Sequence, residues 1–444
     1  MSGNGHGGSK LARQAVVGNT AGTACVVRYA RRATSLWTVP FLLLIVIGIL
    51  GYADIYLLVP TMPWYVQHLG GSNSQLGVLM GVFSGVALVV RPCSGWLSDR
   101  FGSRVSLLLG VAAMSVASLL YVPTGSLDVA VLIRGLHGFG WGLFSVAGAA
   151  LAAELAPPGR RGASLSIYGM SGGLALALGP LVSSALGGEY MTFIASGASA
   201  ALAVGLVILL LRRGPLHARA MDPVADAQVA GTASHSSQQG KARGGGALIS
   251  GGAMLPAGVL LTFMLTYGAV FTFVPVLTEQ RHLGNAGWFF TPYAAAMLAY
   301  RAFTGGLSDR FGRLRVIALG MLAAALGLGL LAATGDEATL VAAALLYSGG
   351  MAAIQPICLA WASDRAPVAE RGAAIATAVA AQDLGISAGS LVVGMIIDAA
   401  GLSAAFAAAA GLALAGFVLV VALARSPSRQ IARQGANCPA RYDQ

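Results

Sequence analysis

Charged residues are scarce in this chain of 444 residues, because Asp, Glu, Lys and Arg together make up only 10% of it. Soluble globular proteins carry about 25% charged residues, since their surfaces face water. Hydrophobic residues make up 56% of the chain, and its mean hydropathy is +0.75. The sequence has too little polar surface for a soluble protein of this length, and it predicts a protein embedded in a membrane.

Motifs of catalysis, metal binding and nucleotide binding are also missing. The four cysteines, Cys25, Cys93, Cys358 and Cys438, form no Cys-x-x-Cys pair and no metal-ligand cluster. No Gly-x-x-x-x-Gly-Lys-Ser/Thr loop is present, so ATP is not expected as the direct energy source. The net charge of +11 arises from basic residues between apolar segments, where they set membrane topology. We therefore expect no enzyme activity, no cofactor, no metal ion and no nucleic-acid partner.

Apolar segments of about 20 residues, the length that spans a bilayer, recur along the whole chain. Each segment is predicted to be a helix, because backbone groups in lipid must form their hydrogen bonds internally. The sequence therefore predicts an all-α membrane protein with twelve transmembrane helices. Their approximate ranges are 37–60, 75–97, 104–122, 128–153, 162–187, 191–212, 253–278, 286–307, 314–333, 338–362, 372–398 and 401–424.

A polar segment rich in Gly, Ser and Gln interrupts the apolar pattern after the sixth helix, and we interpret it as a linker. The predicted organisation is a tail at 1–36, a first half at 37–212, a linker at 213–250, a second half at 251–424 and a tail at 425–444. If the first tail is in the cytoplasm, Arg281 is the only lysine or arginine in the loops on the other side of the membrane. Because positive charge favours the cytoplasmic side, both termini are predicted to be cytoplasmic in a multi-pass protein of the cell membrane, the inner membrane of a bacterium.

The two halves repeat one pattern at a constant spacing. Arg91 recurs as Arg301, and Gly95-Trp-Leu-Ser-Asp-Arg-Phe-Gly102 recurs as Gly305-Gly-Leu-Ser-Asp-Arg-Phe-Gly312. At the same spacing Glu154 corresponds to Asp364. Parallel repeats of this kind are typical of a large class of secondary transporters. The symmetry of Arg91 and Arg301 favours a structural role for both, such as binding helix ends.

The repeated segments resemble the signature of the major facilitator superfamily (MFS), which lies between helices two and three and again in the second half. The resemblance covers nearly the whole chain and implies the MFS fold, two pseudo-symmetric six-helix bundles. It also implies a cytoplasmic gate, whose charged residues hold a neighbouring helix end and separate when the gate opens. The matching residues are Gly95, Asp99, Arg100, Gly102 and Arg104, and Gly305, Asp309, Arg310, Gly312 and Arg313. The alternative is a loop that only orients the chain and turns tightly.

The start of the fourth span, Arg134-Gly-Leu-His-Gly138, is similar to a helix-four pattern of the family. The resemblance associates its arginine with proton coupling. A buried arginine in a membrane span is costly and is usually paired or in contact with water. The alternative is that Arg134 extends to the membrane surface, because it lies close to the end of its span.

The fifth span resembles the antiporter pattern of the export branch of the family. The matching residues are Gly172, Gly173, Gly179 and Pro180. The match is partial, since Ser183 and Ser184 stand where the pattern has further glycines. The resemblance implies export, and small residues here would allow tight packing between the halves. The alternative is ordinary small-residue packing.

Two carboxylates, Asp54 and Asp383, lie inside predicted spans. Intramembrane acids are costly and mark proton or substrate pathways. By family architecture helices one and four face the central cavity, so we expect Asp54 to carry the coupling proton beside Arg134. Asp383 corresponds by the repeat to Gly173, and this asymmetry suggests a second site for proton or substrate. The alternatives are a static hydrogen bond at Asp54 and a packing role at Asp383.

Amide side chains can also bind a substrate, and Gln355 and Gln382 are the candidates within the spans. The residues and the resemblance together predict a secondary transporter that exports a small organic molecule or drug in exchange for protons, by alternating access. Its expected partners are that substrate, protons and the lipid bilayer, and we expect it to act as a monomer. Two alternatives are a proton-coupled importer of a sugar or organic acid and a membrane sensor that does not transport.

Overall fold

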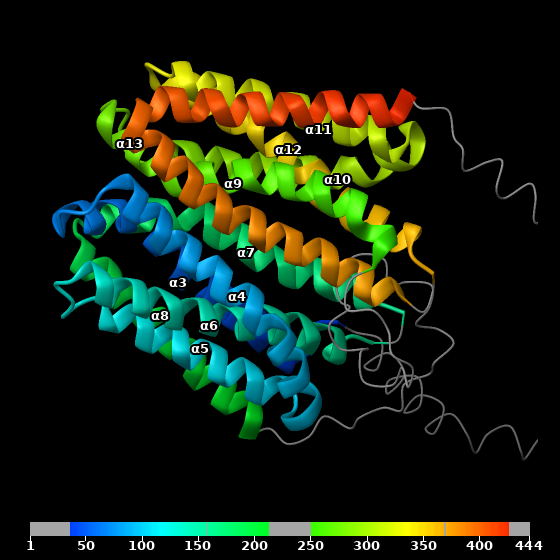
Figure 1. The fold of residues 1–444 in the computed structure, drawn as a ribbon. Helices are drawn as coiled ribbons and strands as arrows, with labels where there is room; N and C mark the ends of the chain where they lie inside the picture. Colours follow the sequence, from blue (N-terminus) through cyan, green and yellow to red (C-terminus); the bar gives the residue numbers. More distant parts are fainter. Residues whose placement is uncertain (1–35, 158, 213–249, 368–369, 426–444) are drawn as a thin grey trace, which may run out of the picture.

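The computed structural model describes residues 36–157, 159–212, 250–367 and 370–425, and of Gly305 and Asp309 it describes the backbone only. The expected tails at 1–36 and 425–444 and the expected linker at 213–250 lie almost entirely outside these residues. The described residues form long α-helices joined by short turns (Figure 1).

Six helices form the first half: α3 (Val39–His68), α4 (Asn73–Phe101), α5 (Ser103–Leu120), α6 (Leu127–Leu155), α7 (Arg161–Ala185) and α8 (Glu189–Arg212). The second half begins with a short 3-10 helix, η1 (Gly251–Ala253). It continues with α9 (Met254–Gln280), α10 (Gly287–Phe311), α11 (Arg313–Ala333), α12 (Glu337–Arg365) and α13 (Arg371–Arg425). Helix α4 begins with a capping box, in which Ser72 and Gln75 each bond to the other's backbone N–H.

Ten of these helices are long and apolar enough to cross a membrane, within the residues described. The 55-residue α13 contains two spans, because Gly401 breaks its helical conformation with a φ of 85°. Helix α10 is not among the ten, because it carries Arg301 and several other polar residues, yet its 25 residues suffice to span a bilayer. With α10 counted and α13 divided, the predicted all-α architecture of twelve helices is confirmed.

A glycine makes the turn after the repeated segment in each half. Gly102 joins α4 to α5 with φ 88° and ψ 148°, and Gly312 joins α10 to α11 with φ 86° and ψ 146°. This conformation is strained for any residue with a Cβ atom, so glycine is required at both turns. The equal angles show that the sequence repeat is also a repeat in three dimensions.

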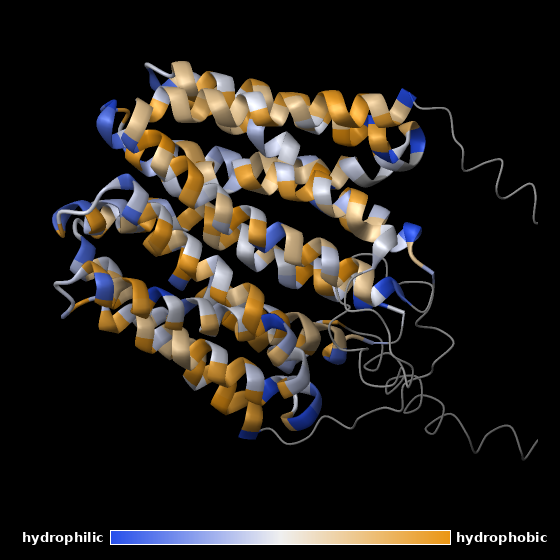
Figure 2. Cartoon of the chain, in the orientation of Figure 1, coloured by the Kyte–Doolittle hydropathy of each residue, from blue (hydrophilic) through white to orange (hydrophobic). Residues whose placement is uncertain are grey.

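The two halves lie side by side, with the first half in the lower part of Figure 1 and the second half in the upper part. They meet mainly where α4 packs on α13 and where α7 packs on α10. Apolar residues run along the lengths of the helices, and polar residues gather at their ends (Figure 2). This distribution suits helices surrounded by lipid.

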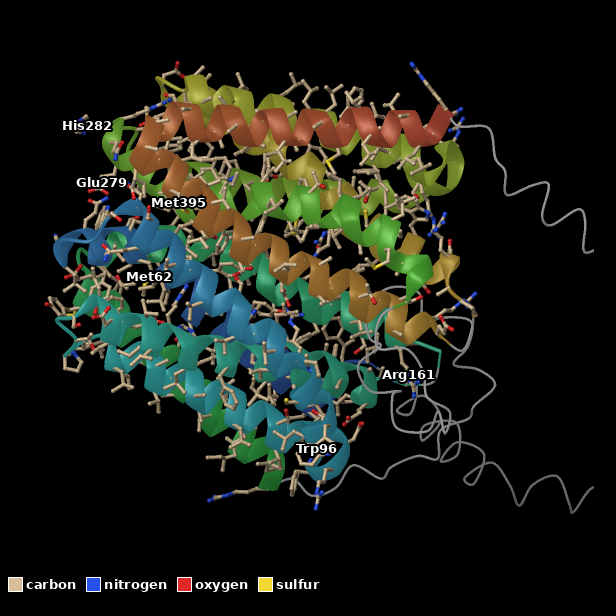
Figure 3. All side chains as sticks on the ribbon, viewed as in Figure 1. Met62, Trp96, Arg161, Glu279, His282 and Met395 are labelled. Atoms are coloured by element: carbon tan, nitrogen blue, oxygen red, sulfur yellow. The ribbon has the colours of Figure 1, made fainter. Side chains whose placement is uncertain are left out.

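The bundle has two ends, which we name by the repeated segments. The signature end contains the turns at Gly102 and Gly312, and the opposite end contains the turns between α3 and α4 and between α9 and α10. Figure 3 shows Trp96 and Arg161 at the signature end, and Glu279 and His282 at the opposite end.

Candidate functional site

Asp54 is fully buried in α3 and contacts three other helices of the first half. Its Oδ2 atom lies 2.8 Å from Nε2 of His137 on α6. Its Oδ1 atom accepts hydrogen bonds from Ser118 of α5 at 2.7 Å and from Ser196 of α8 at 2.6 Å. Buried charges persist in proteins only when they are paired and hydrogen-bonded, and each oxygen of Asp54 meets this requirement.

Arg134 does not pair with Asp54, contrary to our expectation from the sequence. Its side chain lies over the ring of Phe83, with 4.5 Å from the guanidinium carbon to the ring centroid. Its Nη2 atom lies 3.2 Å from the sulfur of Met80, and its other two nitrogens have no hydrogen-bond partner among the described residues. Arg134 is only 1% exposed, which does not fit an arginine that extends to the membrane surface.

His137 takes the place beside Asp54 that we had given to Arg134. The signal for this role was present in the sequence, because His137 lies three residues after Arg134 and so on the same face of α6. The two serines that bind Asp54 gave no comparable signal. Serine is common in helices of this chain, and only the packing of α5 and α8 shows which ones reach the carboxylate.

Asp383 forms an ion pair across the interface between the halves. Its Oδ2 atom lies 2.8 Å from Nε of Arg91, and its Oδ1 atom accepts a hydrogen bond from Nη2 of Arg91 at 3.2 Å. Asp383 is 4% exposed, whereas the side chain of Arg91 is 22% exposed. The pair connects α4 to α13, so any separation of the halves along these helices must break it.

Gln355 and Gln382 also come together, as part of a chain of polar side chains in the second half. Arg301 of α10 donates to the amide oxygen of Gln355 at 2.9 Å, and Gln355 donates to Gln382 at 2.8 Å. Gln382 immediately precedes Asp383 in α13. We call Arg91, Arg301, Gln355, Gln382 and Asp383 the central polar group.

Aromatic rings from both halves lie beside the central polar group. Tyr56 of α3 contacts Phe271 of α9 across the interface, with 5.8 Å between ring centroids. Tyr267 stacks on Phe271 at 5.4 Å, and Tyr52 contacts Trp141 at 5.4 Å. Apolar, aromatic walls with a few polar groups are typical of sites that bind organic molecules.

The glycines of α7 allow it to pack closely on both halves. A Cβ atom at Gly179 would lie 2.7 Å from Cβ of Tyr56, and one at Gly172 would lie 3.1 Å from the Tyr52 ring. A Cβ atom at Gly173 would lie 3.1 Å from Leu298 of α10, in the other half. Pro180 is buried within the same helix. The small residues therefore set the distances of α7 from both α3 and α10.

The repeated segments make matching contacts within each half at the signature end. Ser103 donates to Glu154 at 2.5 Å, and at the corresponding positions Arg313 forms an ion pair with Asp364 at 2.5 Å. Each contact joins the start of the third helix of a half to the end of its fourth helix. From the sequence, Glu154 and Asp364 were recognised as acids at corresponding positions of the repeat, but their partners Ser103 and Arg313 were not predicted.

The remaining charged residues of the predicted gate make different kinds of contact. Asp99 and Arg100 are exposed, and the guanidinium of Arg100 lies over Trp96 of its own helix at 5.5 Å. Arg310 lies over Phe311 in the same way, at 5.5 Å, and Arg104 donates to the backbone oxygen of Leu210 at 3.2 Å. Gly95 is buried, and only the backbone of Gly305 and Asp309 is described. The gating role of these segments stays a prediction.

The halves are joined at the opposite end by Asp398 of α13. It accepts hydrogen bonds from the backbone N–H groups of Asn73 and Ser74, at 3.1 Å and 2.8 Å, and from both their side chains. These residues begin α4, so the carboxylate also faces the positive end of a helix dipole. A cavity of about 450 Å³ lies next to this contact, lined by residues of both halves that include Gln67 and His282.

Comparison with known proteins gives the family. The sequence profile of the Major Facilitator Superfamily matches residues 44–300 and, in a second match, residues 258–439. The chain belongs to the Major Facilitator Superfamily. It is therefore a multi-pass membrane protein of a family of transporters, as the repeated segments had indicated.

Two relatives and one solved structure illustrate this membership. The staphylopine export protein of Staphylococcus aureus is 23% identical over 374 residues, which are 82% of this chain and 90% of that protein. The quinolone resistance protein NorA of Staphylococcus aureus is 24% identical over 162 residues, 36% of this chain but only 42% of NorA. The crystal structure of a point mutant of the nucleoside transporter NupG superposes with a TM-score of 0.69 over 86% of this chain and 99% of that chain, at 13% identity. The MFS fold is thus confirmed.

Proposed function

We propose that the chain exports a small organic molecule in exchange for protons. The observation that carries this proposal is the pair of Asp54 and His137, whose side chains are fully buried and lie 2.8 Å apart. Both side chains can bind a proton, so the pair can exist in forms that differ by one charge. A titratable pair inside a membrane protein is a functional site by default, because it is costly to bury.

Arg134 connects this pair to the movement of helices. Its positive charge acts on His137 and on Tyr121, and its guanidinium contacts Phe83 and Met80 of α4. Movement of α4 against α6 would displace Phe83 and Met80, and with them the guanidinium that they contact, relative to the pair. The charge on the pair and the arrangement of the helices are then coupled, as antiport requires.

Alternating access would use the two ends of the bundle in turn. The hydrogen bonds of Asp398 close the opposite end, and the repeated segments would form the gate at the signature end. We infer that the signature end is cytoplasmic, because lysine and arginine are concentrated in its loops and in the two tails. The two halves of one chain supply every residue of the mechanism, so a monomer suffices.

The direction of transport is inferred from the relatives. One is named as an export protein, and the other is named as a quinolone resistance protein, which is consistent with outward movement of a toxic compound. The partial antiporter pattern of α7 favours the same direction. A proton gradient directed into the cell would then drive the substrate out.

A growth-protection screen followed by a flux assay tests this function. Cells that express the protein are exposed to a panel of toxic organic compounds, and protection by the wild type but not by Asp54→Asn identifies a transported compound. That compound should then enter inside-out vesicles when an acidic interior is imposed. Asp128→Asn, at the exposed start of α6, is the matched control and should protect like the wild type. Equal protection by Asp54→Asn, or flux in the import direction, would contradict the proposal.

A further inference from the structure

The middle of the bundle has more positive than negative charge. Among the described residues, Arg91, Arg134 and Arg301 lie within helices away from both ends, and so do just two acids, Asp54 and Asp383. Asp54 is paired with His137, and Asp383 is paired with Arg91. Two of the three arginines therefore have no carboxylate beside them.

These two arginines differ in their surroundings. Arg134 is 1% exposed and lies over Phe83, so a substrate has no access to it. Arg301 is exposed, and its one hydrogen bond among the described residues goes to Gln355, which is neutral. A guanidinium held in place by an amide, with its remaining donors open, is suited to bind an anion.

The repeat explains why Arg301 has no carboxylate. Arg91 on α4 pairs with Asp383 on α13, and the repeat relates these positions to Arg301 on α10 and Gly173 on α7. Glycine thus stands where symmetry would place the neutralising acid. A Cβ atom at Gly173 would touch Leu298, which lies one turn before Arg301, so the two positions are neighbours in space.

Four tyrosines of the two halves lie close enough to the same guanidinium to feel its charge. Arg301 interacts electrostatically with Tyr52 and Tyr56 of the first half and with Tyr267 and Tyr293 of the second. It therefore faces the space between the halves. The Tyr293 hydroxyl is buried, at 2% exposure of the residue, and has no hydrogen-bond partner among the described residues. A buried hydroxyl without a partner is costly, and a bound anion would satisfy it.

We propose that the substrate is an organic anion with an aromatic body, whose carboxylate binds Arg301 and whose rings lie against Tyr52, Tyr56 and Tyr267. Arg91 contributes no net charge to this site, because Asp383 neutralises it. Gln355 and Gln382 hold Arg301 in position and offer further amide donors. This inference rests on the proposed transport function, and it specifies the class of substrate.

A matched pair of probes tests the charge requirement, namely 1-naphthoate and its neutral amide 1-naphthamide. The full-length protein in lipid nanodiscs is titrated with each probe by calorimetry. We expect naphthoate to bind at least about tenfold more tightly than naphthamide, because a charge-assisted pair is worth more than a neutral hydrogen bond. Equal binding of the two probes, or tighter binding of naphthamide, would overturn the proposal.

Four variants place the site at Arg301. Arg301→Gln should weaken naphthoate binding by roughly 10- to 100-fold and leave naphthamide binding unchanged. Tyr293→Phe should weaken naphthoate binding by about threefold or more, through loss of one hydroxyl donor. Arg425→Gln, at the exposed end of α13, is the control and should bind like the wild type. Arg301→Lys should lie between Arg301→Gln and the wild type, because it keeps the charge but not the planar donors.

A fifth variant restores the missing acid. Gly173→Asp should weaken naphthoate binding much more than Gly173→Asn, which adds the same bulk without the charge. Loss of naphthoate binding in both variants to the same degree would contradict a role for charge at this position. Binding and proton movement are separate readouts, so naphthoate binding through Arg301 without proton movement in proteoliposomes would support this inference and contradict the proposed antiport.

Discussion

The arginines Arg91 and Arg301 occupy corresponding positions in the two halves, yet their partners differ. Arg91 binds the carboxylate of Asp383 in the other half, and Arg301 binds the neutral Gln355 in its own half. We had expected one structural role for both, because the repeat relates them. The difference shows that symmetry of sequence does not imply symmetry of charge, since the partner depends on residues outside the repeated segments.

The signature end shows the opposite behaviour. Gly102 and Gly312 have nearly equal backbone angles, and Ser103 and Arg313 bind the corresponding acids Glu154 and Asp364. Here the repeat is preserved in conformation and in contacts. Parts of the molecule that both halves need for turning and packing are symmetric. The proposed proton site lies in the first half alone, and the proposed anion-binding arginine, Arg301, has no equivalent unpaired arginine in the first half at the corresponding position, because Arg91 is paired with Asp383.

The largest expected effect concerns the proton site, which only the first half contains. His137→Phe should lower proton-driven transport on the order of 100-fold, the lower range for loss of a positioned proton-transfer group. Transport is measured as substrate-dependent proton movement in proteoliposomes. Ser145→Ala in the same helix is the control, because the Ser145 hydroxyl bonds, among the described residues, only to the backbone of Gly142. Unchanged proton movement in His137→Phe would remove His137 from the mechanism.

The ion pair between the halves should have the next largest effect. Arg91→Gln leaves the buried carboxylate of Asp383 without its cation, which typically costs about 3–5 kcal/mol in stability. The double variant Arg91→Gln with Asp383→Asn removes both charges and should recover most of this loss. Thermal unfolding in detergent measures both variants. Additive losses in the double variant would show that the two residues are not energetically coupled.

Two glycines in different surroundings, one in α7 and one in α11, test the close packing of α7. Gly179→Ala places a methyl group 2.7 Å from Cβ of Tyr56 and should destabilise the protein by about 1–3 kcal/mol. Gly329→Ala in α11 meets open space and should be neutral or slightly stabilising. Both are measured by thermal unfolding. Equal stability of the two variants would contradict the close packing of α7 on α3.

The contact at the opposite end should show the smallest effect. Asp398→Asn weakens the bonds to Asn73 and Ser74 and should shift the equilibrium towards opening by about 1–2 kcal/mol, or roughly 5- to 30-fold. A cysteine introduced by Leu76→Cys, at a buried position that lines the cavity beside this contact, reports opening through its rate of thiol labelling in a variant without native cysteines. Asp336→Asn, a helix cap at the same end, is the control. An unchanged labelling rate in Asp398→Asn would show that this contact does not close the opposite end.

The sequence predicted the helices well, because long apolar segments and glycine turns are local features. The prediction included the helix at 286–307, despite its polar residues, and the break between the last two helices, which the structure places at Gly401. The partners of the charged residues could not be predicted, since they depend on how helices rotate against one another. Asp54 was expected beside Arg134 and instead contacts His137, one helical turn away. Only the fold distinguishes between two side chains on one face of a helix.

The central claim is that protons and substrate bind at different places, the Asp54–His137 pair and the central polar group. The most direct test adds 1-naphthoate to the purified protein in weak buffer and measures proton release with a pH indicator. We predict that Asp54→Asn binds naphthoate with nearly normal affinity and releases no protons. Arg301→Gln should bind it weakly but release protons like the wild type once saturated. Normal proton release by Asp54→Asn, or loss of release at saturation in Arg301→Gln, would contradict the separation of the two sites.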